Sequence, residues 1–102
     1  MDFTGRTVIV TGGSRGLGRA IAVSFARAGA YVYVGFRVRA DLAAETLRAV
    51  ESQGGAGKTL GFDVRSRQAV DDVESVWRER DGIDGVVNNA GVARDGLAGM
   101  MS

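Results

Sequence analysis

The 102-residue sequence contains no cysteine and no histidine. Without cysteine there is no disulfide and no thiolate nucleophile, and without either residue type there is no zinc site built from the two. Histidine is also the side chain used most often for proton transfer near neutral pH. These absences leave no predicted metal site and no acid–base centre of the usual kind.

Long apolar runs and a strong net charge are missing as well. No segment approaches the roughly 20 apolar residues of a membrane-spanning helix. The first residues, Met1–Gly5, lack the basic region and apolar region of a secretory signal. The formal net charge of +1 gives no field that would attract nucleic acid or an anionic membrane. We therefore expect a cytoplasmic protein whose partners include neither nucleic acid nor membrane.

The residues that are present match one small globular domain, with 45% hydrophobic and 25% charged residues. Short apolar runs alternate with helical patterns, which is typical of βαβ units and a parallel sheet. The expected strands are Thr7–Thr11, Tyr31–Phe36, Lys58–Asp63 and Ile83–Asn88. The expected helices run from Leu17 to Ala28, from a cap at Asp41 to Gln53, and onward from a cap at Ser66. Gly29 is expected to end the first helix, and the glycine cluster from Gly54 to Gly57 is expected to be a loop.

Right-handed crossovers between these strands predict a doubly wound, Rossmann-type α/β sheet with strand order 3-2-1-4. The first two helices would share one face of the sheet and the third would lie on the other. The expected buried positions are Leu17, Ile21, Ser24, Phe25 and Ala28 in the first helix, Ala43, Leu47 and Val50 in the second, and Ala69, Val73, Val76 and Trp77 in the third. The fourth strand, with Val86 and Val87, would be an exposed edge.

A glycine-rich segment joins the first strand to the first helix. Gly12 would permit a tight turn, Gly16 would let the backbone approach phosphate groups, and Gly18 would permit close packing of helix on strand. Amide groups at the start of a helix attract an anionic pyrophosphate. Glycines also gather in ordinary turns, but the position between a strand and a helix favours a dinucleotide site.

The spacing Thr-Gly-x-x-x-Gly-x-Gly from Thr11 to Gly18 resembles the short-chain dehydrogenase/reductase family. Asp63-Val64 and the run Asn88 to Gly91 resemble the same family in register along the chain. The segments Met1–Arg6 and Val87–Leu97 are similar to its 3-oxoacyl-[acyl-carrier-protein] reductase branch, although related alcohol and steroid dehydrogenases share much of them. That branch implies NADPH-dependent carbonyl reduction in fatty acid biosynthesis.

The resemblance implies a role for each matching residue in binding the cofactor. The residues that would line its phosphates and ribose are Gly12, Gly13, Ser14, Arg15, Gly16, Leu17 and Gly18. Asp63 would accept a hydrogen bond from the adenine amino group beside Val64, and Asn89, Ala90 and Gly91 would border the adenosine ribose and the nicotinamide. The structural alternatives are that Asp63 caps a turn and that Asn88 and Asn89 satisfy backbone groups at the strand end.

The end of the second strand predicts which cofactor is preferred. NAD-specific sites place Asp or Glu there to bind the ribose 2′-hydroxyl, whereas this chain has Phe36 followed by Arg37. A guanidinium binds a 2′-phosphate that a carboxylate would repel, so we expect NADP, with Arg15 approaching from the opposite side. The alternative is that Arg37 and Arg39 only keep the strand end hydrated.

The resemblance implies that catalysis needs a Tyr-x-x-x-Lys pair together with a serine and an asparagine. This sequence does not provide such a set. Tyr31 and Tyr33 are followed four residues later by Gly35 and Arg37, and the only lysine is Lys58. We therefore expect residues 1–102 to be an NADP-binding half-domain that does not turn over alone. Its partner would be a missing C-terminal half or a second copy. The alternative is a non-catalytic nucleotide-binding or self-associating module.

Overall fold

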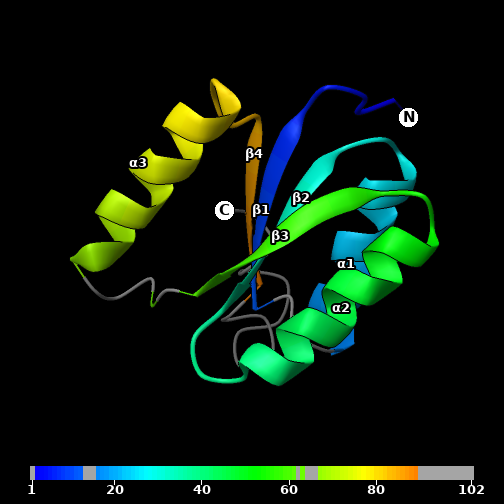
Figure 1. Cartoon of the computed structure of the whole chain (residues 1–102), viewed down its shortest axis with the longest axis horizontal. Helices are drawn as coiled ribbons and strands as arrows, with labels where there is room; N and C mark the ends of the chain where they lie inside the picture. The colour runs from blue at the N-terminus through cyan, green and yellow to red at the C-terminus, as the bar shows by residue number, and fades with distance from the viewer. Residues whose placement is uncertain (1, 13–15, 62, 64–66, 90–102) are drawn as a thin grey trace.

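The four strands form one parallel sheet with the order β3-β2-β1-β4, as predicted. A computed structural model describes residues 2–12, 16–61, 63 and 67–89. The strands are β1 (Thr7–Thr11), β2 (Tyr31–Phe36), β3 (Ala56–Gly61) and β4 (Gly85–Asn88), and the helices are α1 (Gly16–Arg27), α2 (Ala40–Ser52) and α3 (Gln68–Arg80). Helices α1 and α2 cover one face of the sheet and α3 lies alone over the other, which confirms the predicted layers (Figure 1).

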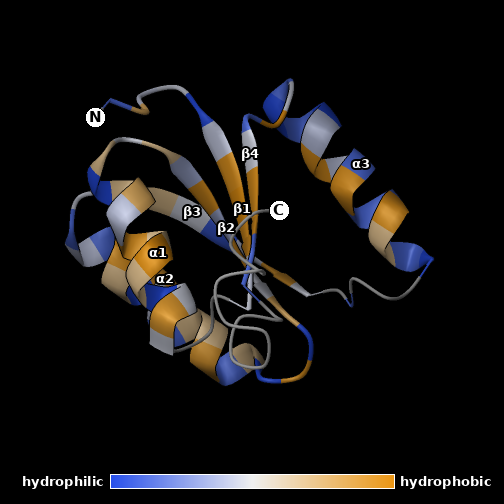
Figure 2. Ribbon diagram, turned by 180° about the vertical axis from the view of Figure 1, so that it is seen from behind, coloured by the Kyte–Doolittle hydropathy of each residue, from blue (hydrophilic) through white to orange (hydrophobic). Residues whose placement is uncertain are grey.

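The two central strands are valine-rich and buried, and their side chains alternate between the two faces. Val8 and Val10 pair with Val32 and Val34 and pack beneath α1 and α2. Ile9 pairs with Tyr33 on the opposite face, where Val76 of α3 packs against both. Figure 2 shows this apolar sheet lying between the two helix layers. The bounds of β1 and β2 are those that the sequence predicted.

The predicted bounds of β3 and the predicted start of β4 were wrong, whereas the predicted end of β4 at Asn88 is confirmed. Strand β3 begins at Ala56, inside the expected glycine loop, and ends at Gly61, so Asp63 lies beyond the strand. A Cβ at Gly57 would lie 2.0 Å from the Val32 carbonyl oxygen, which explains why glycine occurs within this strand. Strand β4 begins at Gly85 rather than Ile83, because the preceding Asp84 bonds to Thr7 through both its amide (2.8 Å) and its carboxylate (2.8 Å).

The helix bounds and caps also differ from the predictions. Helix α1 spans Gly16–Arg27, one residue earlier than predicted, and Gly29 follows it with φ of 100°, as expected for a helix end. Asp41 does not cap α2: Arg39 holds the cap position without a side-chain hydrogen bond, and Asp41 lies in the first turn. Helix α3 begins at Gln68 with Arg67 at its cap position. The predicted cap Ser66 lies outside the described residues.

Two predicted helix faces need correction. Helix α1 buries the small residues Gly18, Ala22 and Ala26, because it packs closely on the sheet, whereas Leu17 is 47% exposed and Ser24 is exposed. Its larger residues Ile21 and Phe25 pack at the margin of the core.

The buried face of α2 agrees with the prediction, and that of α3 agrees in part. In α2, Ala43 and Val50 are buried as predicted, together with Thr46. In α3, Ala69 and Val76 are buried, but Trp77 is 56% exposed.

Helix α3 is held to the sheet through its C-terminal half. The Tyr33 hydroxyl donates a hydrogen bond to Glu79, whose other carboxylate oxygen accepts one from Lys58 Nζ at 2.7 Å. The guanidinium carbon of Arg80 lies 3.7 Å from the ring centroid of Tyr31. These contacts, with Val76, attach the helix at residues 76–80.

An apolar groove of about 370 Å³ lies between the N-terminal half of α3 and the sheet. Its lining residues are Ile9, Thr11, Ala69, Val70, Val73, Val86 and Asn88. Strand β4 borders it as the predicted sheet edge, with Val86 46% exposed. Within the described ranges no helix has the length and apolar character needed to span a membrane.

Candidate nucleotide-binding site

The candidate site lies where β1 ends and α1 begins, at the C-terminal edge of the parallel sheet. Gly12 follows β1 with φ of 66°, and Gly16 opens α1 with φ of 60°. Glycine adopts such a conformation at little cost, as expected for the predicted tight turn at Gly12. The amide groups in the first turn of α1 open toward this edge, where a parallel α/β sheet binds an anion. Gly13, Ser14 and Arg15 lie outside the described residues.

Gly18 and Gly16 differ in what surrounds them. A Cβ on Gly18 would lie 2.1 Å from the Gly12 carbonyl oxygen and 2.7 Å from Asn89 Nδ2. Gly18 therefore lets α1 pack against the ends of β1 and β4, as predicted. A Cβ on Gly16 would meet no atom of the other described residues within 4 Å. The space beside Gly16 leaves room for a phosphate group, while its neighbour Leu17 is exposed at the same end of α1.

The asparagines after β4 bond to the glycine turn. The Thr11 hydroxyl lies 3.1 Å from Asn88 Oδ1 and accepts a hydrogen bond from the Asn89 amide at 3.2 Å. Asn89 Nδ2 donates to the Gly12 carbonyl oxygen at 3.1 Å. The predicted role of satisfying a backbone group at the strand end is therefore confirmed for Asn89, whereas Asn88 bonds to the Thr11 side chain. Their role in binding a cofactor stays a prediction, and Ala90 and Gly91 lie outside the described residues.

One buried acceptor in this network has no partner among the described residues. Asn89 Oδ1 is buried and accepts no hydrogen bond from them, an arrangement that is costly unless a donor reaches it. A sugar hydroxyl is such a donor. The open space at Gly16, the helix start and this acceptor fit the phosphates and ribose of a dinucleotide.

The second strand ends beside the glycine turn without a carboxylate. Strand β2 pairs with β1, and Phe36 is its last residue. Arg37 follows and is exposed to solvent. The position that holds Asp or Glu in NAD-specific sites therefore carries an aromatic ring and a guanidinium, as the sequence predicted.

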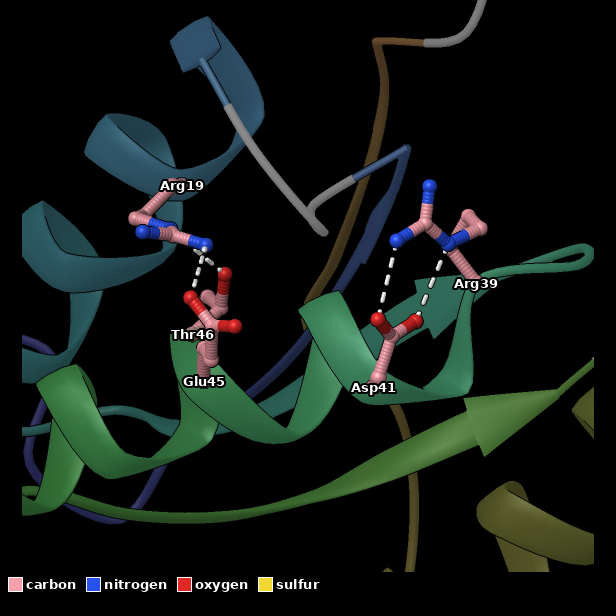
Figure 3. Close-up of polar contacts among 5 residues, drawn as sticks. All are labelled: Arg19, Arg39, Asp41, Glu45 and Thr46. Atoms are coloured by element: carbon pink, nitrogen blue, oxygen red, sulfur yellow. Dashed lines mark hydrogen bonds and ion pairs between the residues drawn. The ribbon is translucent and has the colours of Figure 1, made fainter.

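Arg39 forms an ion pair that sequence reasoning missed. Its Nε and Nη2 lie 3.0 Å and 2.9 Å from the two carboxylate oxygens of Asp41 (Figure 3). Hydrogen bonding to Arg39 lowers the pKa of Asp41 to about 2. The only sequence signal was an acidic residue in the first turn of a helix, where it also complements the helix dipole.

Arg19 forms the second polar link in this region, between α1 and α2. Its Nε donates to the Thr46 hydroxyl at 2.9 Å, and its Nη2 lies 3.6 Å from Glu45 (Figure 3). Because Arg19 lies in the first turn of α1, the link positions the glycine turn relative to the helix that follows Arg37. No motif in the sequence indicated it.

The adenine side of the predicted site is described in part. Asp63 is half-buried and lies two residues after β3, and Val64 lies outside the described residues. The tyrosines are elsewhere: Tyr31 begins β2, at the opposite edge of the sheet from the glycine turn, and Tyr33 is bonded to Glu79. Among the described residues, no group of three histidine, cysteine, aspartate or glutamate side chains could hold a metal ion.

Comparison with known proteins supports this geometry. A family model described as short chain dehydrogenase matches residues 6–102. A 3β-hydroxysteroid dehydrogenase from Eggerthella lenta is 40% identical over 92 residues, covering 89% of this chain and 35% of the relative. A 3-oxoacyl-[acyl-carrier-protein] reductase from Aggregatibacter actinomycetemcomitans is 39% identical over 90 residues, covering 87% and 37%. The chain thus spans about a third of the length of these curated relatives.

Among solved structures, a landomycin C-6 ketoreductase with bound NADP and rabelomycin is 42% identical, with a TM-score of 0.77. The match covers 89% of this chain and 40% of that one. A hydroxysteroid dehydrogenase from Escherichia coli has a TM-score of 0.75 at 28% identity, covering 83% and 36%. Both share the fold found here over the matched region.

Proposed function

Because this chain belongs to the short-chain dehydrogenase/reductase family, we propose that the C-terminal edge of its sheet binds NADP(H). The observation that carries the proposal is the packing of Gly18 against Gly12 and Asn89. A Cβ on Gly18 would overlap the Gly12 carbonyl oxygen at 2.1 Å. This packing brings the start of α1 against the ends of β1 and β4, where its amide groups face the pyrophosphate.

Membership of the family suggests the remaining residues of the proposed site. The pyrophosphate lies over the turn from Gly12 to Gly18, and the unpartnered Asn89 Oδ1 accepts a hydrogen bond from a ribose hydroxyl. Ala90 and Gly91 border the nicotinamide side. Asp63 and Val64 bind the adenine.

The preference for NADP(H) over NAD(H) rests on the end of β2. Exposed Arg37 binds the 2′-phosphate, with Arg15 on the opposite side. A landomycin ketoreductase similar to this chain has been solved with bound NADP, which supports the same cofactor here.

We propose that the bound cofactor serves carbonyl reduction, with a 3-oxoacyl thioester as substrate, to which NADPH supplies a hydride. Reduction also needs a proton donor placed beside the developing alkoxide. Burial raises the pKa of the Tyr33 hydroxyl, and its bond to Glu79 raises it further. Tyr31 lies under the Arg80 guanidinium. Neither tyrosine is placed to donate a proton to the substrate. We therefore propose that the 102-residue chain alone binds the cofactor but does not catalyse the reduction.

Titration calorimetry of the 102-residue chain with NADPH and NADH tests the binding proposal. We expect NADPH to bind more tightly than NADH, and equal affinities would contradict the predicted preference. NADPH oxidation with an acetoacetyl thioester tests the second part. Turnover that co-purifies with the chain and is lost in a Gly16→Asp variant, whose side chain blocks the pyrophosphate, would show that the chain is itself an active reductase.

A second candidate function is a self-associating module, which the groove beneath α3 favours. Val86 at the β4 edge borders this groove, and Trp77 is exposed on α3, the helix that forms its other side. An apolar groove beside an open sheet edge offers a second copy both apolar area and backbone hydrogen bonds. Sedimentation velocity without cofactor separates this candidate from a monomeric binding domain.

A further inference from the structure

We propose that Asp41 sets the affinity of the site for NADP(H) by competing with the 2′-phosphate for the guanidinium of Arg39. The inference rests on the proposed function, because it assumes that the 2′-phosphate lies at the end of β2. It assigns Asp41 as a specificity-determining residue that acts through Arg39. It also makes Arg39 a second ligand of the phosphate beside Arg37.

The competition follows from the geometry of the ion pair. Arg39 directs its Nε and Nη2 toward Asp41, with distances of 3.0 Å and 2.9 Å to the two carboxylate oxygens (Figure 3). This edge of a guanidinium is the one that matches two oxygens of a carboxylate or of a phosphate. A phosphate that binds Arg39 in the same bidentate way must displace Asp41.

The pair lies where a 2′-phosphate would reach it. Arg39 follows the end of β2 by three residues and holds the cap position of α2. Because β2 and β1 are parallel neighbours, the connection that carries Arg37 and Arg39 lies at the same sheet edge as the glycine turn. Arg37 and Arg39 therefore border one end of the proposed site from a single short connection.

The pair contributes little to the stability of the fold. The Arg39 and Asp41 side chains are 54% and 62% exposed, and exposed ion pairs are weak. A phosphate monoester carries more negative charge near neutral pH than a carboxylate, so the guanidinium exchanges toward the phosphate. The negative charge of Asp41 stays nearby and repels the phosphate, which reduces the affinity gained from Arg39. Removing that charge is therefore expected to change binding while the fold stays intact.

The test is an Asp41→Asn variant of the 102-residue chain, titrated with NADPH, NADH and adenosine 2′,5′-bisphosphate. The variant should bind NADPH and the bisphosphate about two- to fivefold more tightly, with NADH unchanged. Raising the salt to about 0.5 M should shrink the gain, because it screens exposed charges. Glu51→Gln in the last turn of α2 is the matched control, because it removes the same charge about 15 Å along the helix. Thermal unfolding of both variants verifies the fold.

Combining Asp41→Asn with Arg39→Ala gives a double-mutant cycle that tests whether the two residues act together. If Asp41 acts through Arg39, the gain from Asp41→Asn disappears in the Arg39→Ala background. A gain that persists there, or an unchanged NADPH affinity in Asp41→Asn while the parent chain prefers NADPH, overturns the inference and leaves the proposed function standing. Failure of the parent and of Asp41→Asn to bind either dinucleotide overturns the proposed function itself.

Discussion

Arg19 and Thr46 join α1 to α2 through a hydrogen bond of 2.9 Å from the guanidinium to a completely buried hydroxyl. Thr46 is one of very few polar side chains buried in the described core. Helices packed through alanine and valine alone can slide, whereas a directional bond fixes their relative position. The bond thereby fixes the first turn of α1 against the helix that begins after Arg39.

Replacing Thr46 with valine tests this link. Valine keeps the shape but removes the acceptor, so we expect a loss of about 1 kcal/mol in the free energy of unfolding, measured by urea denaturation. The loss should be smaller in an Arg19→Ala background, because the donor is then absent. A Thr46→Val protein as stable as the parent would show that the bond does not hold the helices.

The glycines of the turn should respond differently to alanine. Gly18→Ala should cost about 2–3 kcal/mol because the Cβ would overlap the Gly12 carbonyl oxygen at 2.1 Å. Gly16→Ala meets no atom of the other described residues and should cost about 1–2 kcal/mol for its φ of 60° alone. Alanine ordinarily stabilises a helix relative to glycine by about 1 kcal/mol. A Gly18→Ala protein that unfolds at higher urea than the parent would contradict the close approach.

Arg37→Ala should weaken NADPH binding by about 1–3 kcal/mol, because it removes a charge-assisted contact to the 2′-phosphate. NADH affinity should be unchanged, since that cofactor lacks the phosphate. Arg27→Ala is the matched control: it removes the same charge from the exposed last turn of α1, about 16 Å from Gly16 along the helix. Titration calorimetry measures both variants, and an equal loss for both cofactors would exclude a phosphate contact.

The bonds among Tyr33, Glu79 and Lys58 should make stability depend on pH at both extremes. Burial raises the pKa of Tyr33 above its ordinary 10.0, so its contribution is complete below that pH and is lost as the pH rises beyond it. Bonding to Lys58, and then to Tyr33, lowers the pKa of Glu79 below its ordinary 4.5. The Glu79 contribution is therefore complete above 4.5 and is lost as the pH falls through its lowered pKa.

Tyr33→Phe isolates the alkaline part of this dependence. The variant should lose about 1–2 kcal/mol at neutral pH, where the hydroxyl otherwise bonds to a carboxylate. It should lose less further stability than the parent above about pH 10, because the buried phenol at position 33 is no longer there to ionise. Urea unfolding across the pH range measures both effects, and parallel alkaline curves for the two proteins would contradict the assignment.

Self-association is expected to depend on the β4 edge. We expect the chain to form dimers or larger species at micromolar concentration, and Val86→Lys to raise the dissociation constant about tenfold, because lysine protects sheet edges. Val38→Lys is the control, since Val38 is 72% exposed and lies away from the groove lining. Sedimentation velocity distinguishes the variants, and a monomeric parent would exclude the self-associating module.

The strand order could be predicted because alternating strands and helices with a glycine-rich first turn indicate the doubly wound dinucleotide-binding arrangement, whose strand order is 3-2-1-4. Right-handed crossovers then fix which face each helix covers. Strands β1 and β2 were predicted correctly because each is a continuous apolar run. Strand β3 was not, because its residues are largely exposed and Leu60 is its only large apolar residue. Trp77 was misplaced because an apolar stripe indicates what a helix can bury, whereas α3 packs through the neighbouring Val76.

The glycine positions Gly12, Gly16 and Gly18 could be predicted because a positive φ at the first two and a close backbone approach at the third each favour glycine. The pair of Arg39 and Asp41 could not. Side chains two residues apart do not meet within a regular helix, and this pair forms because Arg39 lies outside the helix, with φ of −93° and ψ of 74°.

The two apolar cores on either side of the sheet draw on different parts of the chain, so they can form at different times during synthesis. The core beneath α1 and α2 draws all its buried members from Val8 to Val50, so this side can close while the rest of the chain is still on the ribosome. On the other side, Ile9 and Tyr33 can be covered only after Val76 has been synthesised. The Thr7 amide can bond to the Asp84 carboxylate only after a further stretch of chain, because Asp84 lies 77 positions later. The nascent protein can therefore have the buried residues beneath α1 and α2 in place while the apolar face under α3 is still uncovered, and that uncovered face is the one a chaperone would bind.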